Sequence, residues 1–198
     1  LYVSTLGKDY LKPEVPLLLI RQGKDIYSTI RQAYQALMKN TEAADLKSRT
    51  AKEYFEAFRY LGWCTWEHYH DDINESKIIN DMKTIEASGI PIRYVLIDDG
   101  HLAHKNRQLT DFIPDKQRFP SGWKKIMSYK KENKIKWIGL WYSLSGYWMG
   151  LSPDNGFPQV VRQALYPHAG SLLPGTDSTR IRSFYRYYVS TLKEQGFD

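Results

Sequence analysis

The sequence has a single cysteine, Cys64, among its 198 residues. No disulfide can form within the chain, and a metal cluster held by several cysteines is excluded. The chain also lacks any apolar run near the roughly 18 residues needed to cross a bilayer, and its first residues do not follow the charged-then-apolar pattern of a signal peptide. We therefore expect no membrane partner. Because the chain begins at Leu1 without Met, we expect a piece of a longer protein, and its cellular location stays open.

Two further features are missing. No GxGxxG motif follows any expected strand, which argues against a dinucleotide-binding fold, and we expect no cofactor. The net charge is +6, but Lys and Arg are scattered over expected helices and form no single stripe. We therefore expect no nucleic-acid partner. A basic nucleic-acid binder stays open as a hypothesis, which salt-dependent affinity for DNA would favour.

Aromatic residues, in contrast, are abundant. They make up 14% of the chain and include six Trp and fifteen Tyr. Amphipathic rings stack on sugars or bases, although packing in a core is the commoner role of any one ring. The remaining composition, 42% hydrophobic and 25% charged, is that of an ordinary globular protein. The function therefore depends on which residues accompany the rings.

The chain is organised around the segment Tyr94–Gly100, which reads YVLIDDG. Four apolar residues in a row predict a strand buried on both faces, as in a parallel sheet. Buried carboxylates must be paired or hydrogen-bonded, so such a strand ends in two acids where its carboxyl end opens onto a polar site. Asp98 and Asp99 are therefore candidate functional residues. The alternative is that they cap the following turn.

Strands and helices alternate after residue 59. We expect strands at residues 60–66, 93–100 and 135–142, and helices capped by Asn74, Ser121 and Asp177. A long polar connection is expected before Ser121, and a long loop after residue 142. The alternation predicts an α/β fold with a parallel sheet. A fourth strand is expected to start at Phe197. This series of strands and helices is more like the first half of a (β/α)₈ TIM barrel than a finished domain. A small open α/β sheet is the alternative.

The segments before residue 59 are expected to differ from this pattern. Val15–Ile20 predicts an edge strand, because prolines precede and interrupt it. Asp25 is a plausible N-cap of a linking helix that ends near Lys39. A further short helix is possible around Ala51–Phe58.

In a βα barrel the active site lies at the carboxyl ends of the strands. Aromatic rings stack on the C–H face of a pyranose, and carboxylates accept hydrogen bonds from vicinal hydroxyls. A phosphate site would instead present Arg, Lys and Gly-rich turns. The expected strand ends favour a sugar, because they carry Trp63, Trp66, Asp98, Asp99, His101, Trp141, Tyr142, Tyr147 and Trp148.

Histidines near these positions raise the question of a metal. His68 and His70, with Asp71 and Asp72, resemble metal ligands. Spacing of i,i+2 in a loop is common by chance, and we expect no metal site. By this interpretation His104 is also a loop residue.

Four ordered motifs resemble the raffinose synthase and alkaline α-galactosidase (seed imbibition protein) family, which is related to the retaining α-galactosidases of glycoside hydrolase family 36. They are LGWCTW at residues 61–66, LIDDG at 96–100, QRFPSG at 117–122 and, after Trp141, SGYWMG at 145–150. Residues 1–38 resemble the end of the β-sandwich that precedes the barrel in this family. The resemblance implies three parts: residues 1–24 as the sandwich tail, 25–58 as a linking helical segment, and 59–198 as the N-terminal half of the barrel, truncated at the start of strand 4.

The resemblance also implies an enzyme that acts on an oligosaccharide or galactoside substrate with retention, by hydrolysis or galactosyl transfer. By position, Asp98 and Asp99 match the pair that binds the 4- and 6-hydroxyls of galactose, Trp66 flanks the sugar, and Trp141 lies in the third-strand wall. The nucleophile and the acid/base are implied to lie beyond Asp198, which would start its strand ~15 Å from the carboxyl end. A carbohydrate-binding protein without catalysis is the alternative.

One position departs from the family pattern. His101 stands where the family usually has Trp after Asp-Asp-Gly. An imidazole exchanges stacking area for a polar, titratable tip. We therefore expect His101 at the edge of the pocket, where it would influence the preferred sugar.

Overall fold

The computed structural model describes residues 18–39 and 47–198. The chain divides into two compact units, Leu1–Tyr54 and Phe55–Asp198. No helix within the described ranges combines the length and the apolar character needed to span a membrane. Most of the strand predicted at Val15–Ile20 lies outside the described residues, and residues 18–20 form no strand.

The first unit contains the predicted linking helix, α1 (Ile26–Met38). The carboxylate of Asp25 accepts hydrogen bonds from the backbone N–H groups of Tyr27 and Ser28, which confirms it as the N-cap. The helix predicted around Ala51–Phe58 is wrong. Two 3₁₀ turns, η2 (Arg49–Ala51) and η3 (Glu56–Arg59), take its place. Phe55 between them is extended, and its ring packs edge-on against Phe58 and Trp137, so tertiary packing overrides the local helical pattern.

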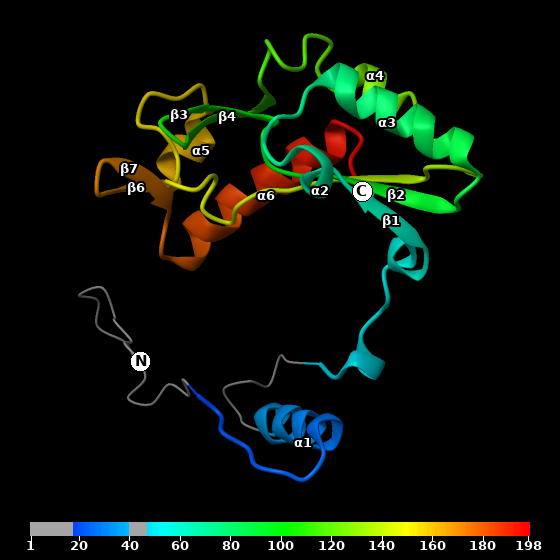
Figure 1. The fold of residues 1–198 in the computed structure, drawn as a ribbon. Coiled ribbons are helices and arrows are strands. Elements are labelled where there is room, and N and C mark those ends of the chain that lie inside the picture. Colours follow the sequence, from blue (N-terminus) through cyan, green and yellow to red (C-terminus); the bar gives the residue numbers. More distant parts are fainter. Residues whose placement is uncertain (1–17, 40–46) are drawn as a thin grey trace. The chain divides into compact units, whose positions relative to one another are not determined.

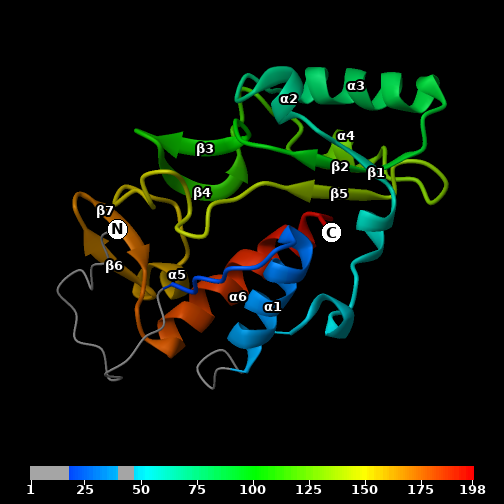
Figure 2. The ribbon, with the colours of Figure 1, turned by 60° about the horizontal axis from the view of Figure 1, so that its bottom comes forward.

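The second unit is built on a parallel sheet with the strand order β1-β2-β5 (Figures 1 and 2). The strands are β1 (Leu61–Cys64), β2 (Ile92–Ile97) and β5 (Trp137–Leu140). Cys64 pairs with Leu96, and Leu96 pairs with Gly139 in the next ladder. The predicted α/β fold and its three parallel strands are confirmed.

Helix α3 (Glu75–Ser88) covers this sheet and also begins where predicted, because the Asn74 side chain accepts from the N–H of Lys77. The next helix, α4 (Lys124–Met127), is shorter than expected, and the prediction that Ser121 caps it is wrong. The N–H and hydroxyl of Ser121 instead donate to the Glu75 carboxylate at 3.0 and 3.3 Å. Glu75 is only 4% exposed, and a buried carboxylate needs such donors.

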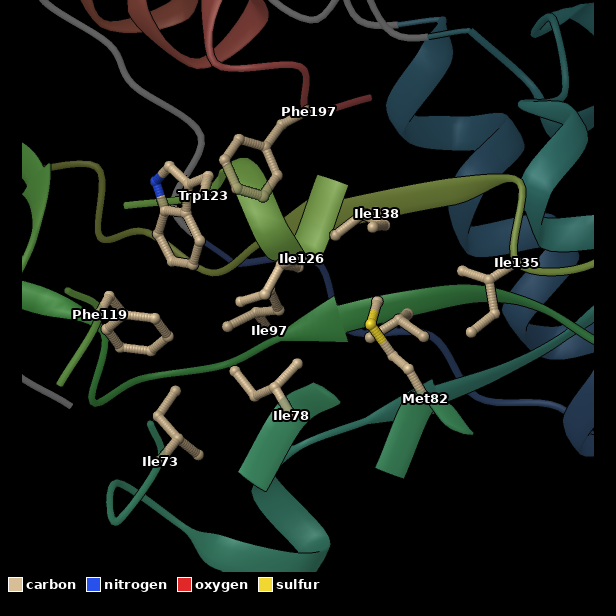
Figure 3. Packing of buried hydrophobic residues seen from close by; sticks show 11 residues of the cluster. Ile73, Ile78, Met82, Ile97, Phe119, Trp123, Ile126, Ile135, Ile138 and Phe197 are labelled. Atoms are coloured by element: carbon tan, nitrogen blue, oxygen red, sulfur yellow. The ribbon is translucent and has the colours of Figure 1, made fainter. Parts of the chain in front are cut away.

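The main core lies between α3, α4 and one face of the sheet (Figure 3). Val95 and Ile97 of β2 are fully buried on that face. Tyr94 and Leu96 point to the opposite face, because side chains alternate along a strand, and they are only half-buried. The prediction that this strand is buried on both faces is therefore confirmed for one face and wrong for the other.

Two β-hairpins replace segments that were predicted to be irregular. The polar connection contains β3 (Leu102–Lys105) and β4 (Gln108–Pro114), and the later loop contains α5 (Gln159–Gln163), β6 (Leu165–His168) and β7 (Ser171–Pro174). The first turn places Asn106 and Arg107 at φ +53° and +59°. Glycine usually marks such a turn, so its signal was weak in this sequence. The hairpins share a second core with α6 (Ser178–Glu194) through buried residues that include Leu109, Phe112 and Phe184.

The end of the chain returns to the sheet. Asp177 is the N-cap of helix α6, as predicted, and its carboxylate accepts from two backbone N–H groups. Phe197 then packs edge-on against Trp123 with the ring centroids 5.1 Å apart. Asp198 is in no strand, but its N–H donates to the carbonyl of Ile138 in β5 at 3.1 Å. The chain thus reaches β5 on the edge opposite to β2.

The turn after β2 depends on a glycine. Gly100 has φ +106°, and a Cβ there would lie 2.2 Å from the carbonyl oxygen of Asp71. Arg118 Nη1 donates to that carbonyl and to the carbonyl of Gly100, at 2.7 and 2.8 Å. Gly122 provides a control, because its φ is +59° and its Cβ position is open.

We expect Gly100→Ala to destabilise the protein more than Gly122→Ala. Both changes incur backbone strain of about 1–3 kcal/mol, and overpacking against Asp71 adds about 1–3 kcal/mol at position 100 alone. Urea unfolding of the two variants measures the difference. Equal free energies of unfolding would show that the close approach to Asp71 is unimportant.

Candidate functional site

The candidate site lies at the carboxyl end of β2. Strand β2 ends at Ile97, and the N–H of Asp98 donates to Thr65 Oγ1 at 2.9 Å. Thr65 is fully buried, and its own N–H donates to the carbonyl of Leu96. The ends of β1 and β2 therefore fix the backbone from which Asp98 and Asp99 project.

Asp98 is half-buried and faces the same side of the sheet as Cys64. Its Oδ2 accepts from Cys64 Sγ at 3.3 Å, and its Oδ1 accepts from the Asp99 N–H at 2.7 Å. Burial raises the pKa of the Cys64 thiol, and the hydrogen bond to Asp98 acts in the same direction. Cys64 therefore stays protonated at neutral pH and serves as a donor.

Asp99 is buried, with 5% exposure, and is surrounded by donors. Its Oδ1 accepts from the Tyr147 hydroxyl at 2.8 Å and from the Gly100 N–H at 2.7 Å. Its Oδ2 accepts from Trp148 Nε1 at 2.6 Å. Burial and the hydrogen bond to Asp99 raise the pKa of Tyr147, so the phenol remains protonated. The structure therefore joins Asp99, Tyr147 and Trp148, which are all sequence-predicted site residues.

Aromatic rings extend the site outward from Asp99. Trp141 stacks on Trp148 with the ring centroids 5.4 Å apart and the planes 29° from parallel. The Arg107 guanidinium lies 5.5 Å from the Trp148 ring centroid, within the range of a cation–π contact. The His104 ring stacks on Tyr147 at 4.7 Å. His104 belongs to β3, so its assignment to a loop was wrong, and the β3–β4 hairpin takes part in the site.

His101 does not lie at the edge of this site. Its side chain is fully buried, so the predicted position at the rim is wrong, whereas its influence on the preferred sugar stays a prediction. Nε2 lies 3.0 Å from the carbonyl oxygen of Trp141, and the ring packs edge-on against Trp123 and Tyr142. The cause is the positive φ of Gly100, which turns the chain so that the next side chain enters the core.

The two tryptophans of the first strand end have different positions. Trp63 packs against the main core on the helix-covered face, opposite to Cys64 by alternation along β1. Its predicted place in the site is therefore wrong. Trp66 begins α2 (Trp66–Tyr69), is half-buried and meets His70 edge-on at 5.0 Å. Its contact with a sugar stays a prediction.

The histidines next to α2 have local partners. His68 is helical, contrary to the prediction of a loop, and its Nδ1 lies 3.2 Å from Asp81 Oδ2. Asp72 pairs with Lys77 at 2.7 Å. Within the part of the chain that the structure describes, no three His, Cys, Asp or Glu side chains gather as a metal site would require.

Sequence reasoning missed Cys64, Thr65, His104 and Arg107 as members or supports of the site. A signal was available for Cys64, because alternation along β1 and β2 places it on the same face as Leu96 and Asp98. His104 and Arg107 could not be found in this way, because the hairpin that carries them was not predicted.

The burial of His101 should be visible in the pH dependence of stability. Desolvation lowers the pKa of His101 from 6.5 to about 4. Between these values the unfolded chain binds more protons than the folded protein, so stability is lost as the pH falls from 6.5 towards 4. The full effect is about 3 kcal/mol.

We expect His101→Gln to remove this part of the pH dependence. Glutamine does not titrate but retains an N–H for the Trp141 carbonyl. Urea unfolding of both proteins at pH 7 and at pH 4.5 measures the change, since other titrating groups contribute equally to the two proteins. The same loss of stability on acidification in both would show that His101 is not a buried neutral group.

The geometry suits a ligand with several hydroxyl groups. Carboxylate oxygens accept hydrogen bonds from hydroxyls, and indole rings offer apolar faces to the C–H side of a sugar ring. Asp98 with Asp99 after β2, and Trp141 with Trp148 after β5, supply these two kinds of surface.

The chain is similar in sequence to known proteins. The sequence model of a family described as raffinose synthase or seed imbibition protein Sip1 matches residues 14–118. A probable galactinol–sucrose galactosyltransferase 6 from Arabidopsis thaliana is 23% identical over 219 aligned residues, which cover 91% of this chain and 29% of the relative. An α-galactosidase from Oryza sativa subsp. japonica is 32% identical over 89 residues, or 43% of this chain and 21% of the relative.

Solved structures share the fold. An α-galactosidase from Lactobacillus brevis aligns with a TM-score of 0.52 at 18% identity, over 71% of this chain and 20% of that protein. A glycoside hydrolase family 36 α-galactosidase from Geobacillus stearothermophilus, in complex with 1-deoxygalactonojirimycin, aligns with a TM-score of 0.51 at 21% identity, over 70% of this chain and 20% of that protein. This chain spans less than a third of the length of these curated relatives and structures.

Proposed function

The chain belongs to the raffinose synthase and seed imbibition protein family, and on this premise we propose that it supplies the sugar-binding part of an enzyme that acts on α-galactosides. The reaction is hydrolysis or galactosyl transfer to an acceptor sugar. The observation that carries the proposal is the pair Asp98 and Asp99 at the carboxyl end of a parallel strand, beside Trp141 and Trp148.

We further propose that residues 59–198 form the first half of a (β/α)₈ barrel, that residues 25–58 link it to the preceding domain, and that residues 1–24 are the tail of a β-sandwich. Three parallel strands in sequential order support the half-barrel. The half-buried face with Tyr94 and Leu96 would line the barrel interior. The hydrogen bonds between Asp198 and Ile138 support a fourth strand next to β5.

In this proposal the chain binds and orients the sugar and leaves the covalent chemistry to later residues. Retaining hydrolysis requires a nucleophile and an acid/base whose carboxyl groups are about 5–5.5 Å apart. Asp98 and Asp99 instead accept hydrogen bonds from Cys64, Tyr147 and Trp148, as suits groups that hold hydroxyls. The nucleophile and the acid/base are proposed to lie beyond Asp198, in the strands that complete the barrel.

The test is an assay of the purified full-length protein on an aryl α-galactoside, on raffinose and on the matching aryl α-glucoside. The proposal predicts turnover of the galactosides and little turnover of the glucoside, whose sugar differs from galactose only in the configuration of the 4-hydroxyl. Binding of galactose without any turnover would favour a carbohydrate-binding protein on the same scaffold. Neither binding nor turnover would reject the proposal.

A further inference from the structure

We propose that Arg107 is a specificity-determining residue for the sugar that is joined to galactose through the glycosidic oxygen. Its guanidinium, at the tip of the β3–β4 hairpin, donates hydrogen bonds to hydroxyl groups of this outer sugar. The ligand class is a neutral sugar ring with neighbouring hydroxyl groups. The inference rests on the proposed function, because the inner galactose defines where the outer sugar begins, but Arg107 is separate from the carboxylates assigned to the inner sugar.

Arg107 lies next to the candidate site and farther out than its carboxylates. The 4- and 6-hydroxyls of galactose are at the end of the ring opposite to C1, so a galactose held through them by the two aspartates directs its glycosidic bond away from β2. Trp148 connects the two places. Its Nε1 donates to Asp99 Oδ2 at 2.6 Å, and the Arg107 guanidinium lies 5.5 Å from the centroid of its ring. Arg107 is therefore placed for contact with a group attached to C1.

The side chain of Arg107 has free donors. A guanidinium carries five N–H donors in its plane, whereas its contact with an aromatic ring uses the face of that plane. Arg107 is exposed, and no carboxylate within residues 18–39 and 47–198 forms an ion pair with it. Arg118 is the contrasting case, since its Nη1 donates to the carbonyls of Asp71 and Gly100. Arg118 is therefore structural, while the donors of Arg107 are available to a ligand.

The backbone of the turn indicates that the arginine side chain is needed. Asn106 and Arg107 have φ +53° and +59°, the conformation in which a two-residue turn prefers Asn followed by Gly. Asparagine visits this region readily, but an arginine at the second position costs about 1–3 kcal/mol in backbone strain. Glycine would remove this strain. A strained arginine with free donors beside a binding site is better explained by a ligand than by the stability of the turn.

Backbone hydrogen bonds fix the position of the turn relative to Trp148. The Met149 N–H donates to the Arg107 carbonyl at 2.9 Å, and the Leu109 N–H donates to the Gly150 carbonyl at 3.0 Å. Both bonds join the hairpin to the loop that carries Trp148. The guanidinium is therefore held in place before the substrate binds, which lowers the entropic cost of binding.

The experiment compares two substrates in the full-length protein. Raffinose carries further sugars on its galactose, whereas α-galactosyl fluoride carries only fluoride at C1. The variants are Arg107→Gly, which removes the side chain and the strain together, and Arg107→Lys, which keeps the charge but not the planar guanidinium. Lys105→Ala is the matched control, because Lys105 lies in the same hairpin with the same charge, but its Nζ is 3.5 Å from Asp154 Oδ2. The kcat/KM for each substrate and the melting temperature are measured.

We expect Arg107→Gly to lower kcat/KM for raffinose about tenfold more than kcat/KM for α-galactosyl fluoride, the size expected for a lost hydrogen bond to a charged group. Arg107→Lys should have an intermediate effect. The melting temperature of Arg107→Gly should not fall, because the relief of strain offsets the lost contact with Trp148. Lys105→Ala should match the parent in all three quantities.

Other outcomes overturn the inference. Equal losses for both substrates in Arg107→Gly would show that Arg107 supports only the inner site. Unchanged kcat/KM for both would leave Arg107 as a surface residue of the turn. A parent that consumes α-galactosyl fluoride but not raffinose has no outer site of this kind. A parent that consumes neither substrate would reject the proposed function itself, and the inference with it.

Discussion

Asp98→Asn is expected to weaken the binding of galactose to the full-length protein by about 1.5–3 kcal/mol, the usual range for a hydrogen bond to a charged group. This corresponds to a rise of Kd by about tenfold to 150-fold. The reason is that Asp98 is half-buried and retains free acceptor positions after its bonds to Cys64 and Asp99. Calorimetric titration with galactose measures the effect.

Asp154→Asn is a suitable control for that titration. Asp154 is largely exposed, and its contact with Lys105 is a surface ion pair at 3.5 Å, which contributes little to stability. Its galactose affinity should equal that of the parent. Unchanged affinity of Asp98→Asn together with a lower melting temperature would show that Asp98 caps a turn and does not bind sugar.

The isolated 198-residue chain is expected to have no glycosidase activity, whereas the full-length protein is expected to turn over α-galactosides. Retaining hydrolysis needs two carboxyl groups about 5–5.5 Å apart in the roles of nucleophile and acid/base. Asp98 and Asp99, the carboxylates of the site, are engaged with Cys64 and Trp148. Parallel assays of the chain and the full-length protein on an aryl α-galactoside, with sizing of the chain, measure the difference.

Turnover by a well-folded monomer of the 198-residue chain would refute the half-barrel proposal. The nucleophile and acid/base would then have to be sought among Asp98, Asp99, Glu67 and Asp154. If the full-length protein were also inactive, the inactivity of the 198-residue chain would carry no information. The activity of the full-length protein is therefore measured first.

The features of the fold that follow local rules were predictable from the sequence. Asp25, Asn74 and Asp177 each precede a run with helical spacing, and each caps a helix in the structure. Strands β2 and β5 were predictable because each contains a run of apolar residues, which is also a local signal. Ser121 shows the limit, because it also looks like a cap, but the buried carboxylate of Glu75 takes its donors.

The candidate site was predictable in part. The acids after β2 and the Tyr147–Trp148 pair were found, because their residue types and their positions after expected strands were enough to identify them. Trp63 and His101 were misplaced, because a single residue changes the face of a strand and the positive φ of Gly100 redirects the chain. Arg107 was missed, because it lies in a two-residue turn without glycine, and such a turn gives little sequence signal for a hairpin.

The most direct test of the central claim is a crystal structure of the full-length protein with bound galactose. The proposal predicts that the sugar lies at the carboxyl end of β2, with two of its hydroxyl oxygens within hydrogen-bonding distance of the Asp98 carboxylate and its C–H face towards an indole ring. A sugar bound elsewhere, or bound here without a hydrogen bond to Asp98, would contradict it.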